Sequence, residues 1–173
     1  MADGSFFITP EDREYAITKY GLGPEKCHII TYGIENEKMP DAHTCRIARE
    51  QLQRQYSIAP QEKILLFNGT LDYLPNQKAL NAILNEINPA LIKAGYSYKI
   101  IICGKNLPDS YLHLEPSINR NIIFAGFVED ISIYLHGSDI FLNAVIEGGG
   151  IKTKLVEALA ANMYAISTES GAL

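Results

Sequence analysis

The stretch "DIFLNAVIEGGGIKTKLVEALAANMYAISTE" (residues 139–169) runs through a strand, a glycine-rich turn, a helix and a second strand. Residues 139–145 and 164–169 are apolar runs of strand length. Residues 151–162 between them carry apolar side chains at helical spacing, and we expect Leu155, Val156 and Leu159 on the buried face. A helix that links two such strands predicts a right-handed crossover between parallel strands.

The same alternation continues upstream of this stretch. Three further apolar runs of strand length lie at residues 63–69, 98–104 and 121–126. Four of the five runs are so continuously apolar that both faces of the strand are expected to be buried. Helical patterns cover residues 75–94, with a kink or restart expected at Asn88-Pro89, and residues 129–136. The fold class predicted is therefore α/β: a parallel sheet with helices on both faces.

The first sixty residues are less regular. Thr9 and Gly21 bracket a predicted helix as N-cap and stop signal, and residues 26–33 read as a strand. Residues 41–55 form a polar helix between two prolines, which we interpret as a connecting element.

The composition narrows the class of protein. A chain of 173 residues suits one domain, or one and a fragment of another. The net charge of −5 argues against a large nucleic-acid-binding surface. Three cysteines without metal-site spacing suit reduced thiols. The start has no signal-peptide pattern and no apolar run is long enough to span a bilayer, so we expect a cytoplasmic protein.

The glycine run 148–150 gives the strongest indication of function. A glycine-rich turn between a strand and a helix presents free backbone N–H groups and the positive helix end to an anion. Lys152 and Lys154 would add charge there, and Glu157 lies on the face shared with Thr153 and Lys154. The pattern matches neither the "GxxxxGK[ST]" nor the "GxGxxG" phosphate-binding motif. A surface turn with a lysine–glutamate pair is the alternative.

Two other loops follow predicted strands. In "NGTLDYLPNQKA" (68–79), Gly69, Thr70 and the Asn76 amide line a ligand cleft or form an ordinary loop. In "AGFVEDISIYL" (125–135), Glu129 or Asp130 is expected to cap a helix. No catalytic triad, metal-ligand set or carboxylate pair is visible.

Taken in order, "ILLFNGTLDYLPNQKAL", "YKIIICG", "NIIFAGFVEDISIYL" and "DIFLNAVIEGGGIKTKLVEALAANMYAISTESGA" resemble the C-terminal, donor-binding domain of family 4 type retaining glycosyltransferases of the GT-B fold. The resemblance implies a Rossmann-like domain over residues 63–173, truncated at its C-terminal end. It also implies a connecting helix over 41–62 and, over 1–40, the segment that leads from the N-terminal domain into this one.

By that resemblance the chain binds a nucleotide-diphospho-sugar donor. Glu157 would accept hydrogen bonds from the ribose hydroxyls, while the amides of residues 149–151 and Lys152 or Lys154 would meet the diphosphate. Phe127 and Val128 would border the base. The donor-binding residues so implied are Gly69, Thr70, Phe127, Val128, Glu147, Gly148, Gly149, Gly150, Ile151, Lys152, Thr153, Lys154 and Glu157. The family generally needs no metal, and no cofactor is expected, because protein cations and helix ends offset the charge of the leaving diphosphate.

Two positions depart from the family pattern. A glutamate that touches the donor sugar usually stands eight residues before the second glutamate, where this chain has Gly149; Glu147, ten residues before Glu157, or backbone groups would replace it. The arginine often found after the first strand is Thr70, for which Lys78 is a poorly placed substitute.

The reaction expected of the longer protein is sugar transfer to a sugar or lipid-linked acceptor, in polysaccharide or glycolipid biosynthesis. The acceptor, the catalytic residues and any peripheral contact with a membrane would belong mainly to an N-terminal domain outside this sequence. The fragment alone is therefore expected to be inactive. A GT-B nucleotide-sugar epimerase and a non-catalytic Rossmann-like nucleotide-binding or regulatory module stay open as alternatives.

Overall fold

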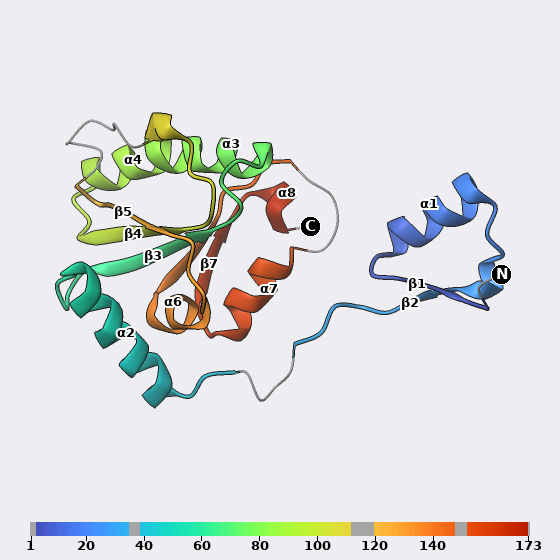
Figure 1. Cartoon of the computed structure of the whole chain (residues 1–173), viewed down its shortest axis with the longest axis horizontal. Coiled ribbons are helices and arrows are strands. Elements are labelled where there is room, and N and C mark those ends of the chain that lie inside the picture. Colours follow the sequence, from blue (N-terminus) through green and yellow to red (C-terminus); the bar gives the residue numbers. More distant parts are fainter. Residues whose placement is uncertain (1–2, 35–38, 112–119, 148–151, 173) are drawn as a thin grey trace.

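A parallel sheet of five strands forms the centre of the computed structural model, which describes residues 3–34, 39–111, 120–147 and 152–172 (Figure 1). The strand order is β5-β4-β3-β6-β7. The strands are β3 (Lys63–Asn68), β4 (Tyr98–Cys103), β5 (Ile122–Gly126), β6 (Ile140–Asn143) and β7 (Tyr164–Ser167). All four pairings are parallel, so the α/β prediction is confirmed.

Helices cover both faces of this sheet (Figure 1). Against one face lie α3 (Leu74–Ala82) and α4 (Asn88–Lys93). Against the other lie α2 (Ala42–Tyr56), α6 (Ser132–Gly137) and α7 (Thr153–Ala160). A short helix, α8 (Glu169–Ala172), follows β7. None of the described helices is both long and apolar enough to cross a membrane.

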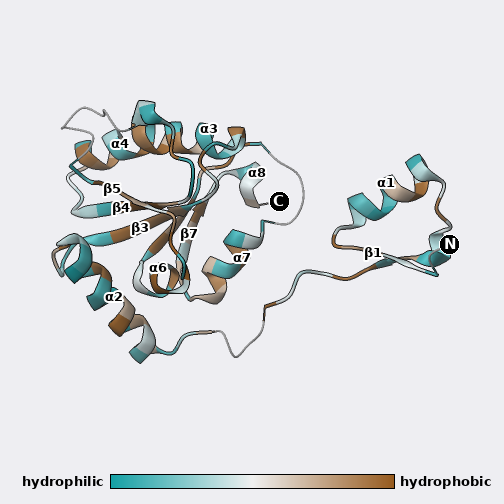
Figure 2. Cartoon of the chain, in the orientation of Figure 1, coloured by the Kyte–Doolittle hydropathy of each residue, from teal (hydrophilic) through white to brown (hydrophobic). Residues whose placement is uncertain are grey.

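Strand β3 shows why the central strands are apolar at every position. Leu65 and Phe67 pack in the cluster beneath α3, while Ile64 and Leu66 pack in the cluster beneath α2 and α6. Successive side chains of a strand point to opposite faces, so a strand covered on both sides needs an apolar residue at each position. The hydropathy colouring shows the resulting apolar interior between polar outer helix surfaces (Figure 2).

The predicted restart at Asn88-Pro89 is confirmed. A π-helical turn, Ile83–Ile87, separates α3 from α4, and Pro89 stands in the first turn of α4. Proline is tolerated there because it lacks an N–H group that the helix start does not need. The Asn88 side chain is fully buried and its Oδ1 accepts a hydrogen bond of 2.7 Å from the Tyr98 hydroxyl on β4.

A small unit precedes the main sheet along the chain (Figure 1). It consists of β1 (Ser5–Phe7), α1 (Pro10–Tyr20), a short 3₁₀ turn (Pro24–Lys26) and β2 (Cys27–Ile29), with the two strands parallel. Thr9 and Gly21 cap α1 as predicted: the Thr9 hydroxyl accepts from Asp12 N, and Gly21 has a φ of 66°. The predicted strand 26–33 is shortened to β2, and β1 was not predicted.

Helix α2 is more than the connecting element expected from its polar sequence. Leu52 is completely buried against the sheet, and Ala48 is buried beside it. Arg49 donates from Nη1 to Asp139 Oδ2 at 2.7 Å, and the same Asp139 oxygen accepts from Ile64 N at 2.8 Å. These contacts join α2 to the starts of β3 and β6, so α2 belongs to the helical layer on this face.

The buried face of α7 also differs from expectation in one position. Ala158 is fully buried and Leu155 packs against the same cluster, whereas the Leu159 side chain is 54% exposed. Helical spacing alone does not tell how far a helix is rolled toward the sheet.

Candidate functional site

The order in which the chain adds strands to the sheet reverses between the neighbouring strands β3 and β6. Chain order runs outward from β3 through β4 and β5 on one side and from β6 through β7 on the other. In open parallel sheets, ligands bind outside the carboxyl ends of the strands at such a switch point. The loops that follow β3 and β6 are the two that contain the predicted glycine turns.

Backbone hydrogen bonds hold the carboxyl ends of three strands close together. Gly69 N donates to Cys103 O at 3.0 Å, and Gly104 N donates to Gly126 O at 2.8 Å. Gly104 has a φ of 156°, and a Cβ added there would overlap the carbonyl oxygen of Gly69. Only glycine allows this approach of the two loops, which leaves open space above the strand ends.

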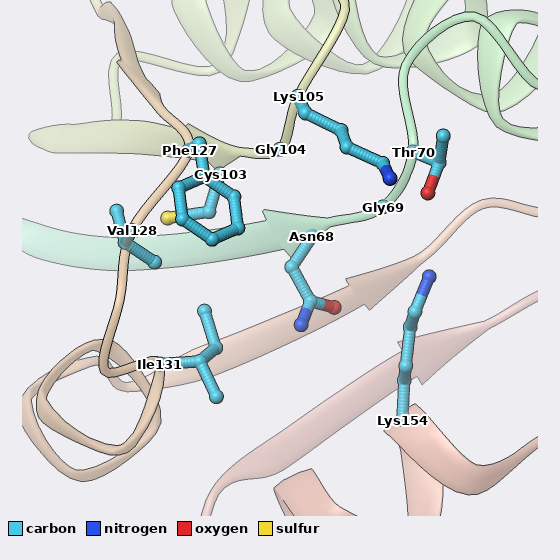
Figure 3. A pocket seen from close by; sticks show the side chains of 10 residues that line it. All are labelled: Asn68, Gly69, Thr70, Cys103, Gly104, Lys105, Phe127, Val128, Ile131 and Lys154. Atoms are coloured by element: carbon cyan, nitrogen blue, oxygen red, sulfur yellow. The ribbon is translucent and has the colours of Figure 1, made fainter.

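A cavity of about 260 Å³ occupies that space (Figure 3). Residues from five segments line it: Asn68, Gly69, Thr70, Cys103, Gly104, Lys105, Phe127, Val128, Ile131 and Lys154. Lys105 reaches from the loop after β4 toward Gly69 and Thr70, and Lys154 extends from α7 toward the same region (Figure 3). Two ammonium groups beside one cavity, whose other walls are largely apolar, provide the positive charge that a diphosphate would need.

Lys154 also lines a neighbouring cavity of about 230 Å³ in the crevice between β3 and β6. Its other walls include Asn76, Asn143, Glu147, Lys152 and Thr153. Burial lowers the pKa of Lys154, and the nearby Glu157 carboxylate opposes that effect. An anion placed between the two cavities would favour the charged form of this lysine.

Glu157 lies one turn beyond Lys154 on α7. Its Oε1 accepts a hydrogen bond of 3.0 Å from the hydroxyl of Tyr32, a residue of the extended segment after β2. Glu157 therefore faces a third cavity, of about 310 Å³, bounded by that segment, α6 and α7. Ile131 lines both this cavity and the one in Figure 3, so the two cavities adjoin at this residue.

Glu147 and Lys78 are brought together by the fold. Lys78 Nζ, on α3, lies 2.7 Å from Glu147 Oε1, in the loop that follows β6. Both side chains are partly exposed, at 38% and 55%. The residue predicted to replace a sugar-contacting glutamate thus has a cationic partner, and the pair stands at the rim of the crevice cavity.

The first loop is held by the Asn76 side chain. Asn76 Nδ2 donates to the Thr70 carbonyl oxygen at 2.9 Å, and the residue is only 7% exposed. Its amide donor therefore maintains the loop, while Gly69 and Thr70 line the first cavity. Within the described part of the chain, Asn68 Oδ1 is a buried oxygen with no hydrogen-bond partner, so it is available as an acceptor.

Phe127 and Val128 form the far wall of the cavity (Figure 3). Phe127 is 72% exposed, as several other aromatic residues of this chain are, so its exposure alone does not indicate a binding surface. Ile131, not Glu129 or Asp130, stands at the N-cap of α6, but Asp130 Oδ1 accepts from Ser132 N, the first residue of that helix, at 2.8 Å.

Four of the predicted donor-binding residues, Gly148, Gly149, Gly150 and Ile151, lie outside the described residues. Of the others, Gly69, Thr70, Phe127, Val128 and Lys154 share the first cavity, and Glu147, Lys152 and Thr153 share the crevice cavity with Lys154. Their roles in binding stay predictions.

Lys105 and Asn68 are site residues that sequence reasoning missed. The switch-point rule did select the loop 104–109, but nothing in "CGKNLP" showed that the lysine would turn back toward the neighbouring loop. Asn68 ends a buried strand, where an amide is expected to cap or to bind, and that signal could have identified it.

Cys103 lines the cavity without being reactive. It is 1% exposed, and burial raises the pKa of its thiol to about 12. A thiol in this state is not a nucleophile at neutral pH. The described residues contain no group of three or more His, Cys, Asp or Glu side chains suited to a metal ion; the expectation that no metal is required stays a prediction.

Comparison with known proteins identifies the family. Residues 62–173 match the family described as "Glycosyl transferases group 1". This chain belongs to that family.

Solved structures show the same fold. A glycosyltransferase from Rickettsia africae ESF-5 superposes with a TM-score of 0.71 at 15% identity, covering 99% of this chain and 45% of that one. Anabaena HepE in complex with UDP and glucose gives a TM-score of 0.69 at 16% identity, covering 99% of this chain and 45% of HepE. This chain thus spans less than half the length of either structural relative.

A protein of Klebsiella pneumoniae described as an uncharacterized 44.6 kDa protein in the cps region is 28% identical over 113 residues. The match covers 62% of this chain and 29% of that protein.

Proposed function

We propose that this chain is the C-terminal, donor-binding domain of a family 4 type retaining glycosyltransferase that transfers a hexose from a nucleotide-diphospho-sugar. One observation carries the proposal: Lys154 and Glu157 stand one turn apart on α7, beside a cavity at the switch point of the sheet. A cation for the diphosphate and a carboxylate for the ribose are thereby spaced along one helix face. Membership of the group 1 family supports the same reading.

The donor would lie across the carboxyl ends of the strands. Lys154 and Lys105 would contact the diphosphate together with the amides of Gly149, Gly150 and Ile151, and Lys152 would add charge nearby. Such preformed positive charge stabilises a leaving diphosphate as its negative charge develops. No metal is needed for that step. Phe127 and Val128 would border the base, with backbone groups reading its edge.

The donor sugar would occupy the crevice side of the site. Glu147, held by Lys78 at 2.7 Å, would accept hydrogen bonds from sugar hydroxyls. Thr153 lines that same crevice, and Gly69 and Thr70 lie close to it in the adjoining cavity. This arrangement would replace the sugar-contacting glutamate that relatives carry where this chain has Gly149.

The acceptor would be a sugar or a lipid-linked sugar bound mainly by another domain of a longer protein. The match to a protein in the cps region of Klebsiella pneumoniae supports a role in surface polysaccharide biosynthesis. The nearness of HepE, solved with UDP and glucose, makes UDP-glucose the first donor to test. The chain by itself would bind donor without transferring sugar.

Isothermal titration with UDP, GDP and ADP tests the proposal. We expect one of the three to bind, and we expect Glu157→Ala to weaken that binding about tenfold, because a charge-assisted contact to the ribose is lost. Glu50→Ala, which removes an exposed carboxylate of α2, is the matched control. Failure of all three nucleotides to bind would favour a non-catalytic module, and unchanged binding by Glu157→Ala would show that the site is misassigned.

A further inference from the structure

Tyr32 connects the segment between β2 and α2 to the opposite side of the candidate site. Its hydroxyl donates to Glu157 Oε1 at 3.0 Å, across 125 residues of sequence. Tyr32 belongs to no strand or helix. This extended segment therefore does more than connect β2 to α2, because it places the Tyr32 hydroxyl on the Glu157 carboxylate.

The hydrogen bond between Tyr32 and Glu157 lies at a partly enclosed cavity. Tyr32 and Ile34 form one wall of the cavity of about 310 Å³, and Ile131, Leu135 and His136 of the α6 region form another. Neither Tyr32 nor Glu157 is fully exposed. Partial removal of water strengthens a hydrogen bond to a carboxylate and limits the positions that the carboxylate can take.

A carboxylate bonded once by Tyr32 still has room for a diol. Its two oxygens offer about four acceptor sites, and the phenol hydrogen bond uses one of them. A glutamate side chain that is already held loses less conformational entropy when two vicinal hydroxyls bind it. The hydroxyl of Tyr32 can therefore improve recognition of a ribose that it does not itself contact.

We propose that Tyr32 is a positioning residue that orients the Glu157 carboxylate for the ribose hydroxyls of the bound nucleotide. The inference rests on the function proposed above, because it assigns Glu157 to the ribose. It adds a contribution to the donor site from residues outside the five-stranded sheet. The same contact makes the segment around Tyr32 sensitive to donor binding, since energetic coupling between two sites is reciprocal.

Ribose selectivity is the readout that separates positioning from general support of the structure. We expect the affinity of the wild-type chain for UDP to exceed that for 2′-deoxy-UDP. In Tyr32→Phe, UDP affinity should fall about fivefold, while 2′-deoxy-UDP affinity changes little. If GDP or ADP binds more tightly than UDP, the same comparison is made with that nucleotide and its 2′-deoxy form.

Tyr15→Phe removes a hydroxyl from an exposed tyrosine of α1 and is the matched control. Thermal unfolding of both variants checks that the fold is kept. An equal loss for UDP and 2′-deoxy-UDP in Tyr32→Phe would indicate structural support and overturn the inference, as would tighter UDP binding, which would mean that Tyr32 competes with the ribose. If the wild-type chain binds none of these nucleotides, the proposed function fails as well.

Discussion

At the scale of single residues, Lys154 is a partly buried cation that lines the candidate site. It extends from α7 into the cavity shown in Figure 3, and burial lowers its pKa. A partly desolvated ammonium group interacts more strongly with a phosphate than a solvated one does. A partly buried cation of this kind, rather than the net charge of the whole chain, would give an acidic protein a place for an anion.

We expect Lys154→Gln to weaken UDP binding about tenfold, because a hydrogen bond between charged groups is lost. Uridine, which has no phosphate, should bind the variant as well as it binds the wild type. Titration calorimetry with both ligands measures the difference. Lys93→Gln, at the end of α4, is the control. A similar loss for uridine would mean that Lys154 does not act on the diphosphate.

Asp139 has a structural role, because its carboxylate connects three elements of the fold. Burial raises its pKa, but hydrogen bonds from Ile64 N and Arg49, with the charge of Arg49 and a contact from Lys63, outweigh that effect and leave the pKa below its usual value of 3.8. The carboxylate thus joins α2, β3 and β6. Sequence reasoning did not identify it, because its partners come from positions 49 and 63.

Asp139→Asn is expected to lower the free energy of unfolding by about 2 kcal/mol at pH 7. Since the folded-state pKa lies below the unfolded value, the stabilisation is fully present above about pH 4 and is lost as the pH falls through the folded-state pKa. Urea unfolding of both proteins at pH 7 and pH 3 measures this. The difference in free energy of unfolding between the wild type and Asp139→Asn should be smaller at pH 3 than at pH 7. Glu86→Gln, on an exposed helix surface, should not differ from the wild type at either pH. A difference in free energy of unfolding that is larger at pH 3 than at pH 7 would contradict the role assigned to Asp139.

At the scale of elements, the contact between α2 and α6 is the closest helix packing on this face of the sheet. Gly137 ends α6, and a Cβ added there would lie 2.7 Å from Leu52 Cδ1 and 2.9 Å from the Ala48 carbonyl carbon. Backbone atoms cannot move aside as a side chain can. The glycine therefore sets the distance between the two helices.

Gly137→Ala is expected to lower the free energy of unfolding by about 1–3 kcal/mol, the usual cost of overpacking a core. Gly33→Ala introduces the same methyl group where nothing lies within 4 Å and should change stability by less than about 0.5 kcal/mol. Chemical denaturation measures both. If Gly137→Ala were as stable as the wild type, α2 and α6 would not be packed as closely as the contacts of Gly137 indicate.

The elements that were predicted correctly are those with a strong local pattern. Apolar runs of strand length identified all five strands of the sheet, and Thr9, Gly21 and Pro89 marked helix boundaries through their own backbone chemistry. Strand β1 was missed because three residues are too few for a periodicity. The burial of α2 against the sheet and the exposure of Leu159 depend on tertiary packing, which the spacing of apolar residues along a helix does not determine.

At the scale of the whole molecule, the site brings together loops that are far apart in the sequence. The glycine turns after β3 and β6 were predictable, because parallel strands place their carboxyl ends at one edge of the sheet. The direction of Lys105 and the contact between Tyr32 and Glu157 were not predictable, since each depends on how a loop without regular structure crosses the others.

The measurement that tests the central claim most directly is an NMR titration of the isotopically labelled chain with UDP-glucose, read at the backbone amides. We predict that the shifted resonances will gather at the carboxyl ends of the strands, at Gly69, Thr70, Lys105, Val128, Lys154 and Glu157. Amides of α1 serve as the internal reference. Shifts confined to other surfaces, or no shifts at millimolar UDP-glucose, would contradict the assignment of this edge of the sheet as a donor-binding site.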